Sequence, residues 1–161
     1  MSSDSSRPSR AFFAILIGGL IAGTLDITYA CIFSYVRRGT RPAVILQSVA
    51  SGALGAKAFT GGAKTAALGL AFHFLIAIIA ATVYYFASRV LRFMVTQAVI
   101  CGILYGVFVY LFMNCIVLRL SAIHSKTWPW SYPWPALIGG LLIHMFGIGL
   151  PIALVTRRYS K

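Results

Sequence analysis

Acidic side chains are almost missing from this chain of 161 residues. Asp4 and Asp26 are the only two, and 10% of all residues carry a charge. With no carboxylate pair, no Walker loop, no HExxH motif and no GxSxG motif, the sequence offers no known hydrolytic or nucleotide-binding machinery. Because 60% of the residues are apolar, well above the share in soluble domains, we exclude a water-soluble enzyme and predict one integral membrane domain over residues 1–161.

Cysteine pairs are missing as well. Cys31, Cys101 and Cys115 each lie inside an apolar segment, without a CxxC motif or a histidine at metal-ligand spacing. We therefore interpret them as small apolar side chains. The first apolar segment is too long for a cleaved signal peptide and no small-x-small site closes it, so we expect it to remain in the protein.

Positive charge is plentiful by contrast, with 14 Lys and Arg residues and a formal net charge of +12. Most of these residues lie at or near the ends of apolar segments, where they anchor helices to lipid head groups. No basic stretch carries the interleaved aromatic residues of a nucleic-acid groove. The expected partner is the lipid bilayer, and we expect no nucleic acid.

Four apolar segments are long enough to cross a bilayer, since about 20 residues at a rise of about 1.5 Å span its core of about 30 Å. They cover residues 11–36, 65–88, 93–118 and 135–156. Lipid offers no partner for open backbone groups, so each must be helical. A fifth segment, 43–59, has apolar residues on one side and polar ones around the rest, which is typical of an interfacial helix. We predict an all-α, four-helix membrane bundle with a short interfacial helix after the first span.

Charge counting leaves the orientation of this bundle open. In the four-span arrangement each side of the membrane carries seven basic residues, so the positive-inside rule favours neither. The loop before the last span alternates Trp and Tyr with proline, a composition suited to the outer head-group level. On that ground we expect both termini in the cytoplasm.

The spans repeat a pattern when taken in pairs. Each pair has a GxxxG helix followed by a GLxxH helix; the six glycines are Gly19, Gly23, Gly69, Gly102, Gly106 and Gly140. Small residues at this spacing let membrane helices approach closely, so we expect these glycines to be helix-packing positions. Two such hairpins would be related by a pseudo-two-fold axis along the membrane normal.

Polar residues lie on the same small-residue stripes, about 12 to 15 Å below one face. They form a predicted intramembrane cluster of Asp26, His73, His144, Tyr110 and Asn114. A carboxylate at this depth costs about 2.5 to 3.5 kcal/mol, so we expect Asp26 to be protonated or paired with a protonated histidine. The alternative is that these side chains only join helices by hydrogen bonds.

Three functions are compatible with this cluster. In the first, the chain is a proton, ion or solute conduit in which Asp26 and the histidines titrate. In the second, it is an accessory or assembly subunit packed on a membrane-protein partner or on another copy of itself. The third is an electron carrier in which His73 and His144 ligate haem b from both sides. We assign no catalytic residue and do not expect an enzyme. The simplest expectation is that the chain binds no cofactor.

With its glycine-rich first helix and the pairs Gly69/His73 and Gly140/His144, the sequence resembles small bacterial multi-pass inner-membrane proteins of the YagU-like kind. The resemblance covers all four spans, although this chain lacks a longer polar central loop. It implies a bacterial inner-membrane location and a family without an established activity, and it assigns no functional residues.

Overall fold

The computed structural model describes residues 10–124 and 126–160, and every regular element in that part of the chain is a helix. The predicted all-α fold is thereby confirmed. In chain order the elements are α1 (Arg10–Arg38), α2 (Pro42–Leu54), η1 (Gly55–Thr60), α3 (Gly62–Val90), α4 (Phe93–Thr96), α5 (Ala98–Phe112), η2 (Met113–Val117), α6 (Leu118–Leu120), η3 (Pro129–Ser131), α7 (Trp134–Leu142), η4 (Ile143–Gly149) and α8 (Leu150–Tyr159).

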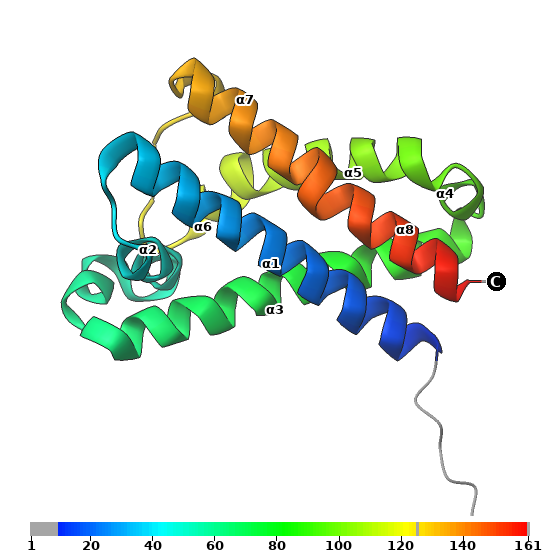
Figure 1. Ribbon diagram of the computed structural model, residues 1–161, viewed down its shortest axis with the longest axis horizontal. Coiled ribbons are helices and arrows are strands. Elements are labelled where there is room, and N and C mark those ends of the chain that lie inside the picture. The colour runs from blue at the N-terminus through cyan, green and yellow to red at the C-terminus, as the bar shows by residue number, and fades with distance from the viewer. Residues whose placement is uncertain (1–9, 125, 161) are drawn as a thin grey trace, which may run out of the picture.

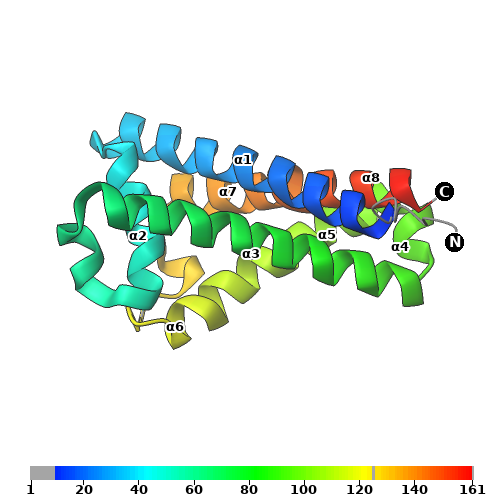
Figure 2. The ribbon, with the colours of Figure 1, turned by 90° about the horizontal axis from the view of Figure 1, so that it is seen from below.

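Four long rods run alongside one another (Figures 1 and 2). They are α1, α3, the continuous Ala98–Leu120 and the continuous Trp134–Tyr159. Successive rods alternate in direction, so α1 begins and α8 ends at the same end of the bundle (Figure 2). The stacked rings of Phe13 and Tyr159, with centroids 6.2 Å apart, hold these two ends together.

A fifth segment, Pro42–Thr60, is also long and apolar enough to cross a membrane, one more than the four predicted. It differs from the others in direction: α2 is seen end-on in Figure 1 and runs across the rods in Figure 2. The side chain of Gln47, which is buried, donates to the Gly62 carbonyl at 3.0 Å and fixes α2 to the start of α3. Ala122 donates to the Gly52 carbonyl at 2.8 Å, so the loop after α6 lies at the same end as α2.

The predicted span 93–118 differs from the structure at its beginning. Residues Phe93–Thr96 form the separate short helix α4, and the rod begins only at Ala98. The backbone of Gln97 leaves the helical region at φ −104° and ψ 41°, because the chain reverses direction between α3 and α5. Tyr84 donates to the Met94 carbonyl at 3.0 Å and holds this reversal against α3.

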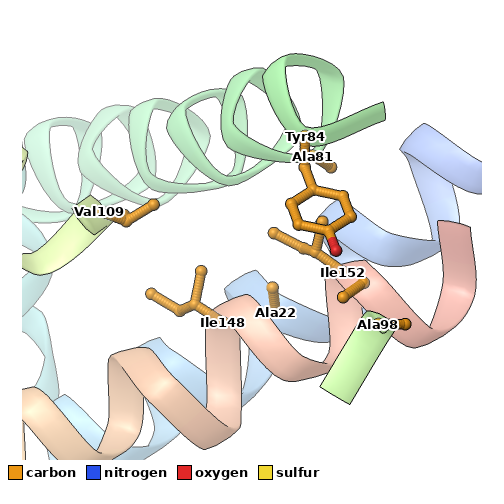
Figure 3. Close-up of a cluster of buried hydrophobic side chains, with 8 residues drawn as sticks. Ala22, Ala81, Tyr84, Ala98, Val109, Ile148 and Ile152 are labelled. Carbon is orange, nitrogen blue, oxygen red and sulfur yellow. The ribbon is translucent and has the colours of Figure 1, made fainter. Parts of the chain in front are cut away.

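The buried core is made largely of small side chains (Figure 3). Its members come from α1, α3, α5, η4 and α8: Ala22, Ala81, Tyr84, Ala98, Val109, Ile148, Ile152 and Ala153. Large apolar residues lie mainly outside; Val36, Leu120 and Val90, for example, are each more than 75% exposed. Small residues inside and large apolar residues outside are compatible with a multi-pass membrane protein, in which helices associate by close packing.

Candidate functional site

A cavity of about 230 Å³ lies between the rods, and four polar side chains line it. Asp26 comes from α1, His73 from α3, Asn114 from η2 and His144 from η4. The remaining wall is apolar and includes Val49 of α2. Residues far apart in the sequence, on four different helices, therefore meet around one space.

Both histidine rings are fixed by backbone carbonyls. His73 Nε2 lies 2.8 Å from the carbonyl oxygen of Gly23 on the neighbouring helix, and His144 Nδ1 lies 2.8 Å from that of Gly140 on its own helix. A carbonyl oxygen only accepts hydrogen bonds, so these two ring nitrogens carry the protons. In each neutral ring the other nitrogen keeps its lone pair.

Asp26 lies beside His144 but is not hydrogen-bonded to it. Asp26 Oδ1 and His144 Nδ1 are 4.0 Å apart, and the proton on that nitrogen is already donated to Gly140. The interaction is therefore a charge contact, which strengthens when His144 is protonated. Among the described residues no donor bonds the Asp26 carboxylate, and this side chain keeps 21% of its surface exposed.

Two π-helical turns supply half of the polar lining. Met113–Val117 and Ile143–Gly149 depart from α-helical spacing, and they carry Asn114 and His144 respectively. Each π turn adds a residue to the helical circuit and re-aims the side chains around it, and such turns are frequent at functional sites. Hydrophobic periodicity does not reveal them, because their flanking helices continue the same rod.

Tyr110 is close to this cluster without lining the cavity. Its ring packs edge-on against His144, with centroids 5.2 Å apart, and its buried hydroxyl has no hydrogen-bond partner within residues 10–124 and 126–160. The Asn114 amide donates to the Tyr110 carbonyl at 2.8 Å. Tyr110 thus supports the ring of His144, while Asn114 reaches the cavity.

The six predicted packing glycines all lie at close approaches between parts of the chain. A Cβ on Gly19 would lie 2.8 Å from Ile78 Cα, and one on Gly23 would lie 2.8 Å from the Phe74 ring. A Cβ on Gly106 would overlap the His144 carbonyl oxygen. The three others would meet these atoms: Leu46 O for Gly69, Ala153 Cβ for Gly102 and the Tyr110 ring for Gly140.

The two GLxxH motifs have different surroundings. Gly69 contacts the crosswise helix α2, whereas Gly140 contacts Tyr110 within the bundle. His73 reaches across to another helix, whereas His144 bonds its own. The pseudo-two-fold relation between the hairpins stays a prediction.

Sequence reasoning missed the apolar part of this site. Val49 of α2, with Ile76 and Met113, completes the cavity wall. The pattern of 43–59 places Gln47 and Ser51 on the polar side of that helix, yet both are buried in the structure, and no sequence signal says what the helix covers. The crosswise position of α2 against α3 determines that Val49 lines the cavity.

The haem interpretation gains no support from the described geometry. The His73 ring is held by the Gly23 carbonyl through Nε2, which leaves Nδ1 as its unprotonated nitrogen, and Tyr110 packs edge-on against the ring of His144. Haem binding by His73 and His144 stays a prediction, as does the role of an accessory subunit.

No protein-family model, curated protein or solved structure matches this chain. The resemblance to YagU-like proteins accordingly stays a prediction. The feature of this chain that bears on its function is the cavity lined by Asp26, His73, Asn114 and His144.

Proposed function

We propose that this chain is a multi-pass inner-membrane protein that conducts protons or a small solute through the cavity lined by Asp26, His73 and His144. The observation that carries the proposal is the convergence of the lone described carboxylate and two imidazoles on one cavity. Ionisable groups at membrane depth are costly, and they mark ion and proton pathways in membrane proteins.

In this proposal four rods cross the membrane and α2 lies at the interface. The crosswise direction of α2 supports it, since a helix in that orientation does not run from one membrane face to the other (Figures 1 and 2). An even number of crossings also agrees with α1 beginning and α8 ending at one end of the bundle. We propose that this end faces the cytoplasm.

Asp26 is the proposed titrating group. Its carboxylate takes up a proton and thereby loses the charge that is costly in this surrounding; release of the proton restores it. His144, at 4.0 Å, offsets the negative charge when its ring is protonated. His73 also lines this cavity, and its unprotonated ring nitrogen, Nδ1, is a second proton acceptor.

Passage also requires the cavity to open. Ala22, Val109 and Ile148 belong both to the cavity wall and to the buried core, so the core closes the cavity on that side. The π-helical turn η4 ends two residues before Pro151, and π turns and prolines are where membrane helices bend. We propose that movement at this point alternately opens and closes the path.

The test is proton flux in liposomes containing the purified protein, measured with an enclosed pH-sensitive dye under an imposed potassium diffusion potential. We expect flux above that of empty liposomes, and we expect Asp26→Asn to abolish it. His144→Gln should lower the flux, because it removes the ring that offsets the charge of Asp26. Its matched control is His124→Gln, since His124 is exposed in the loop after α6. Flux that is equal in wild type and Asp26→Asn would refute the proposal.

A further inference from the structure

The polar cavity has an apolar neighbour on the side of α3 and α5. A second cavity of about 280 Å³ adjoins it and shares four lining residues with it: Ile76, Ala80, Val109 and Met113. The outer walls of this second cavity are apolar side chains that are about half exposed, namely Ile79, Val83, Phe108 and Phe112. The apolar cavity therefore lies between the polar floor and the outer faces of α3 and α5.

The groove between α3 and α5 is held open by the course of these helices. They diverge toward the end where α2 lies (Figure 2). At the other side Tyr105 donates to the Ala80 carbonyl at 2.8 Å and packs edge-on against Tyr84, with ring centroids 5.0 Å apart. The tyrosine pair closes one end of the groove, and its walls offer a surface for an apolar chain.

The polar floor offers mainly acceptors. The N–H of each neutral histidine ring is already used, since His73 donates to Gly23 and His144 to Gly140, and one of the two N–H groups of the Asn114 amide donates to Tyr110. Each neutral histidine ring keeps one lone pair, and the Asn114 oxygen and the Asp26 carboxylate are further acceptors. A site that contains a carboxylate and has more acceptors than donors favours a cation that donates hydrogen bonds, and it disfavours an anion.

A bare metal ion does not satisfy this arrangement, since no three acidic, histidine or cysteine side chains among the described residues are grouped closely enough to coordinate one. A larger cation with several N–H donors reaches acceptors that are farther apart. The apolar groove adds a site for the body of the same molecule.

We infer that this cavity and groove bind an amphiphilic organic cation, a primary amine with an apolar chain, which enters from the bilayer between α3 and α5. The ammonium group donates to Asp26 and to the histidine lone pairs, and the chain lies along Ile79 and Phe108. The inference rests on the proposed function, because it names the solute class that the same cavity would take.

The experiment measures binding of radiolabelled dodecylamine to immobilised protein in detergent, with unlabelled competitors of equal chain length. We expect saturable binding in which dodecyltrimethylammonium, which has the charge but no N–H donor, competes at least about tenfold more weakly. Dodecanoate should not compete. Equal competition by dodecanoate would show that the polar floor selects nothing and would overturn the inference.

Two kinds of variant test the site itself. Asp26→Asn should weaken dodecylamine binding by about 10- to 100-fold, the effect of losing a charged hydrogen-bond partner. Ile79→Trp should fill the groove and weaken binding while leaving Asp26 intact. Ile32→Trp is its matched control, because Ile32 on α1 is exposed to a similar extent, 59% against 52%, and lines none of these cavities.

The outcomes separate this inference from the proposed function. Amine binding that depends on Asp26, without proton flux, supports the inference and refutes the proton conduit. Asp26-dependent flux without amine binding does the reverse. If Ile79→Trp leaves amine binding unchanged, or if it instead disrupts a dimer detected by cross-linking while no amine binds, the groove is not a ligand site and the inference fails.

Discussion

Gly106 is the position where one added methyl group should disturb the site most directly. A Cβ there would overlap the His144 carbonyl oxygen and lie 2.5 Å from Met145 Cα. Both atoms belong to the backbone of η4, so no side chain can rotate away. Ordinary contact requires α5 and η4 to separate by about 1 Å, and overpacking of this kind costs about 1–3 kcal/mol.

The helix preference of alanine over glycine recovers up to about 1 kcal/mol. We therefore expect Gly106→Ala to lower the free energy of unfolding by about 1–2 kcal/mol. Gly18→Ala is the matched control: its added Cβ would meet Ile152 Cα at 3.6 Å, an ordinary contact, so stability should stay the same or rise slightly.

The assay is unfolding in detergent by increasing sodium dodecyl sulfate, followed by circular dichroism, with both variants and the wild type side by side. Because the overlap moves the backbone of His144, Gly106→Ala should also reduce any flux or amine binding in the native protein. If Gly106→Ala is as stable as Gly18→Ala, the close approach of α5 to η4 is wrong and so is the position of His144.

Three further predictions concern the frame around the cavity. Tyr105→Phe removes the hydrogen bond to the Ala80 carbonyl and should cost about 0.5–1.5 kcal/mol in the same unfolding assay; no change would show that the α3–α5 contact does not depend on it. Gln47→Leu removes the side-chain hydrogen bond that ties α2 to the Gly62 carbonyl, which then keeps only donors from α3 such as Thr65 Oγ1; limited proteolysis should therefore cut the chain between α2 and α3 faster than in wild type, and an unchanged rate would contradict the packing of α2. Epitope tags at the two termini should be accessible from the same side of sealed vesicles, and accessibility from opposite sides would refute four crossings.

Much of the architecture could be predicted from composition and spacing. Long apolar segments must form helices in lipid because their backbone groups have no other partner, so the all-α fold followed directly. The break at Gln97 was not predicted, because Thr96 and Gln97 are uncharged and the segment 93–118 around them is apolar enough to be taken as one span; the reversal between α3 and α5 interrupts it there. The segment Pro42–Thr60 is apolar enough for either role, and its direction depends on Gln47 and on the close approach of Leu46 to Gly69.

For the candidate site, the sequence by itself determined which residues are exceptional. Asp26, His73 and His144 stand out because charged and imidazole side chains are expensive in an apolar segment, and this holds in any fold. Only the tertiary structure decided which of their atoms are free, because the Gly23 and Gly140 carbonyls take one proton from each ring. It also decided that an apolar cavity adjoins the polar one between α3 and α5, since helix divergence and two π-helical turns depend on packing between segments and leave no periodic trace in the sequence.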